Sequence, residues 1–206
     1  MKVILINGSP RKEGNTATAL NLIVNELKNH GVETETIHVG AEAIHGCIGC
    51  GYCRTSKDNM CVYGGDMLNE ILPKIREADG LIIGSPVYYS GVAGTMKCFL
   101  DRLFYTSSVY FRFKPAAAVC AVRRSGGTFA FQQLNNYLNL GQMLIVPSTY
   151  WNVIHGRAEK EALHDGEGVQ TLQTLAKNMA WLLKVVAQTN VEKPAPDKKV
   201  FTNFVR

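Results

Sequence analysis

Short apolar runs alternate along the chain with longer segments in which apolar residues recur at helical spacing. The first run, Val3 to Ile6, is continuously aliphatic and stops at Asn7-Gly8, which is typical of a strand buried on both faces of a parallel sheet. A polar stretch at 9–16 follows, and residues 17–28 then carry a helical apolar pattern. The chain therefore begins with a strand, a polar turn and a helix, which is half of a βαβ unit.

The same alternation continues as far as about residue 188. Residues 32–39 alternate apolar and polar positions and predict an edge strand, whereas Leu81 to Gly84 is continuously apolar and predicts a central strand. Pro73 interrupts a helical pattern and is expected to kink that helix or to delay its start. Further strands are expected at 116–122 and 143–146, further helices at 66–75, 96–103, 129–140 and 172–183, and a long loop at 147–168.

Five strands that alternate with five helices predict a three-layer α/β/α fold with a five-stranded parallel sheet. Because a polar turn follows the first strand, the flavodoxin-like strand order 2-1-3-4-5 fits best. In that order the carboxyl ends of the first, third and fourth strands lie side by side, where open α/β sheets bind their ligands. We expect one domain over residues 1–188 and a C-terminal extension at 189–206.

The loop after the first strand has the composition of a phosphate-binding loop. A helix N-terminus offers unpaired backbone N–H groups and a partial positive charge. Hydroxyl, cationic and amide donors are added by Ser9, Arg11, Asn15 and Thr16. The spacing matches neither a Walker A loop nor the G-x-G-x-x-G motif. An ordinary surface turn rich in capping residues is the alternative interpretation.

The loops after the third and fourth strands extend the same predicted site. Residues 85–95 read SPVYYSGVAGT and offer flat aromatic surface, while 123–128 read RRSGGT and offer cations and exposed backbone amides. A ligand with a phosphate at one end and a flat, polar-edged ring at the other would contact all three loops, and FMN is such a ligand. For each of these two loops alone, aromatic packing or a simple strand-to-helix turn is the alternative.

Charge and hydropathy narrow the classes of partner. The net charge of +5 favours anionic ligands, but the basic residues are scattered, so we expect no nucleic-acid partner. No apolar run approaches the roughly 20 residues that a membrane span requires, so no membrane partner is expected. The N-terminus reads as a strand rather than a signal peptide, which favours a cytoplasmic location.

The segments SPRKEGNT (9–16) and GSPVYYSGVAGTMKCFLDR (84–102), with the Gly-Gly pair of the fourth loop, resemble the flavodoxin-like NAD(P)H-dependent FMN reductases. The resemblance covers roughly residues 1–185 and is closest to the branch that contains the iron–sulfur flavoproteins. It implies an FMN cofactor, NAD(P)H as co-substrate, a small-molecule electron acceptor and a homodimer or homotetramer. It also implies that the flavin carries the chemistry, so no catalytic side chain is assigned.

The resemblance also implies the residues that contact each part of FMN. They are Ser9, Arg11, Asn15 and Thr16 at the phosphate; Pro86, Val87, Tyr88 and Tyr89 along the isoalloxazine ring, with Met96 and Lys97 close behind; and Arg124, Gly126 and Gly127 at the pyrimidine edge of the ring.

Four of the six cysteines follow the pattern Cys47-x2-Cys50-x2-Cys53-x7-Cys61. In a chain without a secretory signal, such clustering indicates metal or redox chemistry rather than a disulfide framework. Four thiolates suit a 4Fe–4S cluster or a tetrahedral zinc ion, and the compact spacing is similar to that of the iron–sulfur flavoproteins. A loop of reduced thiols without metal is the third interpretation.

Three functions follow from these motifs. The first is an FMN-dependent NAD(P)H oxidoreductase that passes hydride from nicotinamide to flavin and on to quinone, nitroaromatic, azo or flavin acceptors. The second is an iron–sulfur flavoprotein that carries electrons between FMN and a ferredoxin-type partner through a 4Fe–4S cluster on the cysteine loop. The third is a thiol- or metal-sensing binding protein. In the loop after the fifth strand, Trp151 and His155 are candidates for substrate contact, with surface packing as the favoured alternative.

Overall fold

The middle layer of the molecule is a β-sheet in which the long strands are all parallel. The computed structural model describes residues 1–198, 200 and 202, and over these the sheet contains seven strands. The strands are β1 (Lys2–Asn7), β2 (Glu33–His38), β3 (Gly80–Tyr88), β4 (Gly91–Val92), β5 (Pro115–Val122), β6 (Leu144–Ile145) and β7 (Val153–His155). Their order is β2-β1-β3-β5-β6, with β4 paired to β3 and β7 paired to β5.

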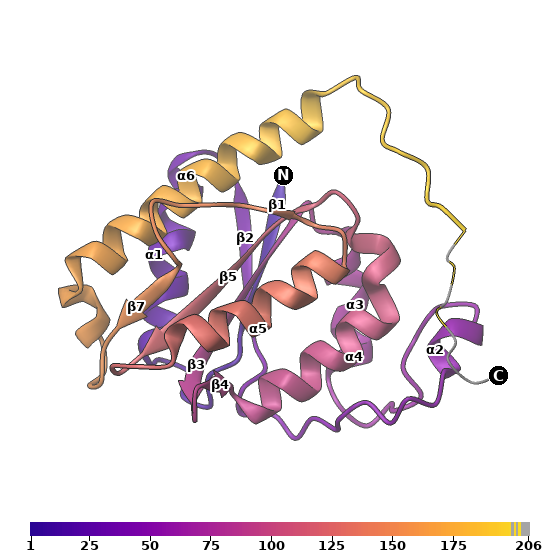
Figure 1. Cartoon of the computed structure of the whole chain (residues 1–206), viewed down its shortest axis with the longest axis horizontal. Coiled ribbons are helices and arrows are strands. Elements are labelled where there is room, and N and C mark those ends of the chain that lie inside the picture. Colours follow the sequence, from indigo (N-terminus) through magenta and orange to yellow (C-terminus); the bar gives the residue numbers. More distant parts are fainter. Residues whose placement is uncertain (199, 201, 203–206) are drawn as a thin grey trace.

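Helices cover both faces of this sheet. The helices of the described chain are α1 (Asn15–Asn29), α2 (Tyr52–Thr55), α3 (Leu68–Glu77), α4 (Gly94–Phe111), α5 (Gly127–Leu140) and α6 (Gly166–Gln188), with a 3₁₀ turn at Glu161–His164. Helices α1 and α6 pack on one face, and α3, α4 and α5 on the other (Figure 1).

The first apolar run shows why the sheet forms. Successive side chains of a strand point to opposite faces. Accordingly Val3 and Leu5 join the core beneath α1 and α6, while Ile4 and Ile6 join the core beneath α3, α4 and α5, and all four are fully buried. A strand without polar positions is therefore stable only between two helical layers.

The predicted flavodoxin-like fold and strand order are confirmed, with β2 at the edge and β3 in the interior of the sheet. Helix α3 begins at Leu68, two residues after the predicted start, and it continues through Pro73 to Glu77. Its Pro73 therefore lies inside the helix without ending it.

The fifth strand predicted at 143–146 is confirmed as the two-residue β6, but the prediction of only five strands is wrong, because β7 follows along the same strand of the sheet. β6 pairs with the start of β5 and β7 with its end, and the segment between them leaves the sheet. The buried Asn152 holds this detour: its Nδ2 donates to the Ala118 carbonyl at 3.0 Å, and its own carbonyl accepts from the Cys120 amide at 2.9 Å. The predicted loop at 147–168 therefore contains a strand and a 3₁₀ turn, and the two-residue β4 is a further strand that the pattern did not predict.

After Gln188 the described part of the chain leaves α6 in an extended path along one side of the molecule (Figure 1). It contacts the body of the molecule where Arg112 Nη2 donates to the Pro194 carbonyl at 3.3 Å.

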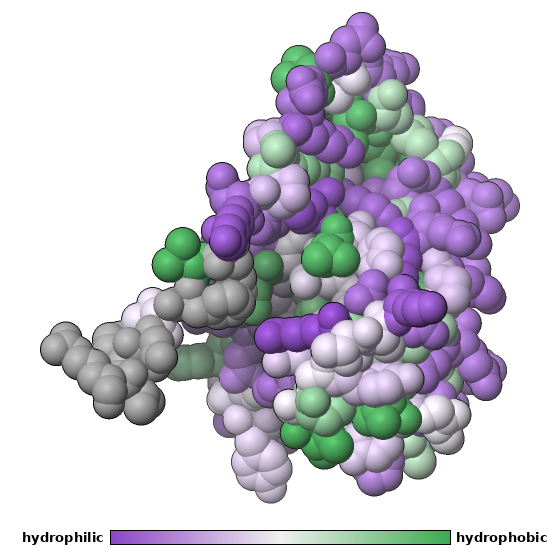
Figure 2. Space-filling view, turned by 90° about the vertical axis from the view of Figure 1, so that its right-hand side faces the viewer, coloured by the Kyte–Doolittle hydropathy of each residue, from purple (hydrophilic) through white to green (hydrophobic). Residues whose placement is uncertain are grey.

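The face that carries α2 is mostly polar, with apolar side chains in small separate groups (Figure 2). None of the helices in the described ranges combines the length and the apolar character that crossing a membrane requires.

Candidate functional site

The loop after β1 is tightly folded onto its neighbours. Asn7 Oδ1 accepts a hydrogen bond from the Ser9 amide at 3.0 Å, and Ser9 Oγ accepts one from the Arg11 amide at 3.2 Å. Gly40 passes so close that a Cβ there would overlap the Ser9 carbonyl. Only glycine fits at this crossing, so the position of the loop is fixed from outside as well as from within.

The N-terminus of α1 contains a hydroxyl group without a partner. Thr16 is 2% exposed, and its Oγ1 is buried without a hydrogen bond to any described residue. Its neighbour Asn15 uses its side chain elsewhere: Nδ2 donates to the Ala158 carbonyl at 2.8 Å, and Oδ1 accepts from the Ala162 amide at 3.1 Å. An unpaired buried hydroxyl beside first-turn amides suits an anionic acceptor such as a phosphate.

The structure thus brings Ser9, Arg11 and Thr16 together at one helix N-terminus, and it places Asn15 there with its amide already bonded. A phosphate contact from each of these four residues remains a prediction.

The second loop is a β-hairpin formed by the end of β3 and by β4. Its two-residue turn consists of Tyr89 and Ser90, with φ angles of +49° and +60°. Non-glycine residues rarely adopt this backbone conformation, and they concentrate at ligand sites. Tyr88 is about half exposed and Tyr89 is fully exposed, while the Val92 amide donates to Gln133 Oε1 at 3.2 Å and ties the hairpin to α5. The hairpin therefore presents two aromatic rings from an anchored base.

Close contacts join the three loops. A Cβ on Gly8 would lie 2.6 Å from Met96 Cγ, which places the first loop against the start of α4. Gly126, with a φ of +87°, faces the hairpin turn, and a Cβ on it would lie 2.9 Å from the Ser90 Cα. Gly127 in turn lies against Val153 of β7. The loops at the carboxyl ends of β1, β3 and β5 therefore lie next to one another, as the strand order predicts. That they form one ligand site remains a prediction.

Lys97, expected close behind a flavin ring, bonds to side chains of α4 and α5. Its Nζ donates to Asp101 Oδ1 at 2.7 Å and to the Tyr137 hydroxyl at 2.9 Å. Burial alone would lower the pKa of Lys97, but these bonds outweigh it and raise the pKa to about 12. Lys97 is therefore a fixed cation that holds the two helices together.

A cavity of about 280 Å³ adjoins the third loop. Arg124, Trp151 and His155 line it, so both candidates from the loop after the fifth strand lie in its wall. His155 Nδ1 lies 3.0 Å from Asp165 Oδ2, and Asp165 Oδ1 accepts from the Gly168 amide at the start of α6. Burial would raise the pKa of Asp165, but the hydrogen bonds from Gly168 and His155 hold it below its ordinary value of 3.8.

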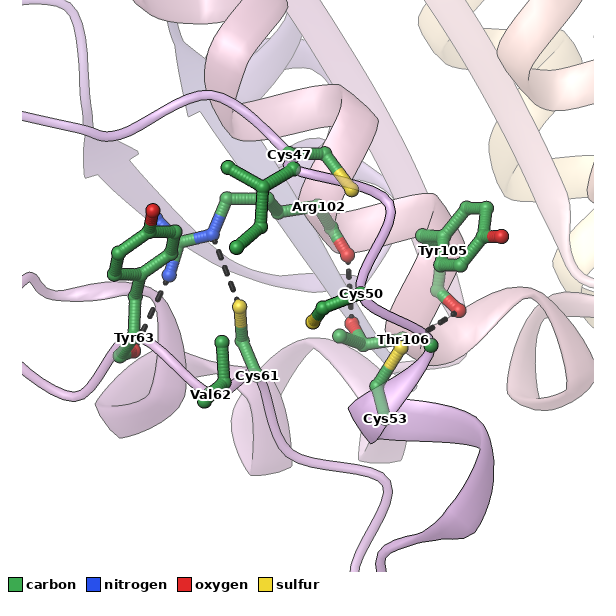
Figure 3. Close-up of a pocket in the computed structure, with 11 residues that line it drawn as sticks. Cys47, Cys50, Cys53, Cys61, Val62, Tyr63, Arg102, Tyr105 and Thr106 are labelled. Carbon is green, nitrogen blue, oxygen red and sulfur yellow. Dashed lines mark hydrogen bonds between the residues drawn. The ribbon is translucent and has the colours of Figure 1, made fainter.

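The four clustered cysteines line a second, smaller cavity of about 20 Å³ (Figure 3). Gly49 and Gly51 have φ angles of +66° and +74°, and these left-handed positions coil the 47–53 segment tightly. Cys53 is buried, and its burial, together with the nearby thiol groups of the other three cysteines, raises the pKa of its thiol. The predicted ligands therefore surround one space that is closed on one side by α4.

The four cysteines border one cavity from several sides. Within residues 1–198, 200 and 202, no three Cys, His, Asp or Glu side chains converge on a point that could hold one metal ion. In a 4Fe–4S cluster each cysteine binds a different iron, so its four ligands enclose a cavity rather than meet at a point. Binding of a cluster by these four cysteines remains a prediction.

A three-layer α/β/α fold with this strand order, and with polar loops gathered at the switch point, defines a flavodoxin-like protein. Residues 1–158 match the model of the NADPH-dependent FMN reductase family, and the chain belongs to that family. It is thus an FMN-dependent oxidoreductase by class.

Individual relatives agree with this assignment. The chain is 34% identical over 194 residues to an iron–sulfur flavoprotein of Methanocaldococcus jannaschii, an alignment that covers 90% of this chain and 99% of that protein. It is 30% identical over 199 residues to an iron–sulfur flavoprotein of Methanosarcina thermophila, with 94% and 100% covered. A solved flavodoxin from the domain Archaea shares the fold at 18% identity, with a TM-score of 0.60 over 89% of this chain and 99% of that one.

Proposed function

We propose that this oxidoreductase transfers electrons between FMN at the three loops and a 4Fe–4S cluster held by Cys47, Cys50, Cys53 and Cys61. The observation that carries the proposal is that all four cysteines line one cavity in a chain of a flavin-binding family. Two relatives of nearly equal length are iron–sulfur flavoproteins, which supports the same conclusion.

Residues of the three loops would hold FMN from end to end. The α1 N-terminus with Ser9, Arg11 and Thr16 suits the phosphate, because it combines amides, a cation and an unpaired hydroxyl. The hairpin residues Pro86 to Tyr89 suit the flat ring, and the 124–127 loop suits its polar edge. When bound, FMN accepts hydride and releases electrons singly or in pairs. Arg124 and the backbone amides would supply fixed positive charge for the reduced ring.

At the cysteine cavity, the chain supplies thiolates at fixed positions. The coil at 47–53 turns three cysteines toward α4, and Cys61 reaches the same cavity from the following segment. A cluster there would supply one-electron transfer. A small-molecule acceptor or a ferredoxin-type partner would then receive the electrons.

Anaerobic reconstitution tests both cofactors separately. Titration with FMN should produce a bound-flavin spectrum, and iron and sulfide analysis should give about four of each per chain. Fewer than one iron per chain would contradict the cluster, and a failure to bind FMN would contradict the flavin assignment. Alanine at Cys50 and Cys53 should abolish iron uptake and leave FMN binding intact.

The cavity beside the third loop supports a second proposal, that NAD(P)H donates hydride to the flavin. A cation at Arg124 and the aromatic surface of Trp151 line a space of about 280 Å³ beside the proposed ring site, and such a lining suits a phosphorylated dinucleotide. Under anaerobic conditions NADPH should bleach the flavin absorbance of the loaded protein, and Arg124→Gln should slow the reaction. A flavin that stays oxidised with excess NADPH and NADH would contradict this proposal.

We also propose that the chain forms a homodimer or homotetramer. Val109 on α4 and Leu140 on α5 are 70% and 77% exposed and line a groove of about 770 Å³. Burial of such side chains against a second copy would be favourable. Sedimentation velocity of the FMN-loaded protein should show a species of at least twice the chain mass, and a monomer at micromolar concentration would contradict the proposal.

A further inference from the structure

Arg102 is a buried arginine in the middle of α4, and it is 1% exposed. Among the described residues it is the largest side chain that is fully buried. A buried guanidinium is costly unless each of its donors finds a partner. The hydrogen-bond partners of Arg102 therefore indicate the role of this buried charge.

One part of the guanidinium is neutralised and enclosed. Nη1 forms an ion pair with Asp66, whose side chain is 6% exposed, and it also donates to the His45 carbonyl at 3.3 Å. Nη2 donates to the Tyr63 carbonyl at 3.3 Å. The Tyr63 ring lies 5.3 Å from the guanidinium carbon and stacks on His45 at 4.8 Å.

The remaining donor points to a cysteine. Arg102 Nε donates to Cys61 Sγ at 3.2 Å, at the wall of the cysteine cavity (Figure 3). The backbone of Cys61 is held as well, because its amide donates to Asn69 Oδ1 at 3.0 Å and its carbonyl accepts from Asn69 Nδ2 at 2.9 Å. Cys61 is the one cysteine of the four that lies outside the tight 47–53 coil, and both its sulfur and its backbone are held in place.

We propose that Arg102 is a positioning residue that fixes the Cys61 sulfur and raises the reduction potential of a cluster bound in this cavity. The inference rests on the proposed function, because it concerns the cluster suggested there. A 4Fe–4S cluster with four thiolates is anionic and gains one more negative charge when it takes up an electron. A cation and an N–H group at a ligand sulfur stabilise the added charge, and such hydrogen bonds are known to tune cluster potentials.

The geometry of the ion pair preserves this effect. Asp66 binds Nη1, whereas the sulfur faces Nε, so the sulfur meets the positive side of the pair. A lysine could supply the charge but not the planar array of donors that reaches Asp66, two carbonyls and the sulfur together. The side-chain type is therefore part of the inference.

Two variants and one control test the inference in the FMN-loaded full chain. Asp66→Asn with Arg102→Met removes both charges together, so that neither is left buried and unpaired, and the introduced asparagine keeps an acceptor for the Leu68 amide. Arg102→Lys keeps the charge and removes the Nε donor. The control is Arg54→Gln, which removes a cation of the same segment that lies over the Tyr105 ring at 4.3 Å and does not bond a cysteine.

The readouts are the cluster midpoint potential, followed by EPR with dithionite as the reductant, and the rate of iron loss to a chelator. We expect the control to match the wild type. The double variant should show a more negative midpoint and several-fold faster iron loss, and Arg102→Lys a smaller shift in the same direction. FMN affinity, measured alongside, reports whether each variant is folded.

A folded double variant with unchanged midpoint and unchanged iron loss would overturn the inference. If the double variant does not bind FMN, Arg102→Lys decides: an unchanged midpoint overturns the inference and a negative shift supports it. If the wild type binds FMN but takes up no iron, this inference and the cluster both fall, while the flavin assignment stands.

Discussion

Thr16 is the residue that points most directly to an anion site, because its Oγ1 is a buried hydroxyl without a partner in the described structure and lies at a helix N-terminus. Thr16→Val keeps the shape and removes the hydroxyl. A hydrogen bond to a charged group contributes about 1.5–3 kcal/mol, so the FMN dissociation constant should rise at least tenfold, as measured by fluorescence titration.

Thr18→Val is the matched control, since the Thr18 hydroxyl bonds the Gly14 carbonyl within the same helix turn. It should leave FMN affinity within about twofold of the wild type, and Thr16→Ser should restore most of the affinity that valine removes. Equal effects at positions 16 and 18 would contradict a specific contact between the Thr16 hydroxyl and the phosphate.

Gly126 illustrates how one backbone conformation joins two loops. Its φ of +87° is unfavourable for other residues, and a Cβ would lie 2.8 Å from Ser90 Oγ. Gly126→Ala should lower the free energy of unfolding by roughly 1–2 kcal/mol or more and weaken FMN binding. Urea unfolding and FMN titration measure the two effects. At Gly166, which is helical, an added Cβ would meet no side chain within 4 Å. Gly166→Ala should therefore leave the free energy of unfolding unchanged or raise it slightly, and a loss equal to that of Gly126→Ala would contradict the argument.

Among the secondary-structure elements, α6 is stabilised at its N-terminus by the capping residue Asp165. Asp165 Oδ1 caps the helix through the Gly168 amide, and Oδ2 accepts from the His155 amide at 2.8 Å, which ties β7 to the same point. Asp165→Ala should therefore cost about 1 kcal/mol of stability at pH 7 in urea unfolding. Asp165→Asn, which retains an acceptor, should cost less.

The same residue gives a pH dependence with a defined sign. Because its pKa lies below 3.8 in the folded state, Asp165 stabilises the protein above pH 3.8, and this contribution disappears as the pH falls through the folded pKa. The difference in unfolding free energy between wild type and Asp165→Ala should be complete at pH 7 and shrink below about pH 4. A difference that grows toward acid pH would show the opposite sign and refute the assignment.

The sequence predicts the elements whose signal is local. Val3 to Ile6 is recognisable as a two-faced strand because each residue is apolar, and the three loops are found because parallel strands place their ends together. Strand β7 was not predicted, since it depends on Asn152 bonding to β5 more than thirty residues away. Arg102 was not predicted to have a role for the same reason. It occupies an ordinary helical position, and only the fold brings its partners in the 45–66 segment into contact with it.

At the scale of the whole molecule, the described structure supports the proposal that residues 1–188 fold without the extension. The apolar residues of α6, among them Leu172, Met179 and Leu183, are buried against α1 and the sheet. Beyond Gln188 the described residues are exposed. Burial is the main cause that lowers the pKa of Lys114, and the like charge of Lys193 nearby lowers it further. Exposed terminal segments with few contacts contribute little to stability.

Truncation after Gln188 should therefore leave the FMN dissociation constant within about twofold and the melting temperature within a few degrees of the full chain. The matched control is truncation after Lys177, which removes the buried Met179 and Leu183 and should abolish cooperative unfolding, because each large buried side chain contributes about 2–5 kcal/mol. Thermal melts followed by circular dichroism, with FMN titration, compare the two. If the protein truncated after Gln188 also loses its cooperative melting transition, the extension belongs to the folded domain, and the boundary at 188 is wrong.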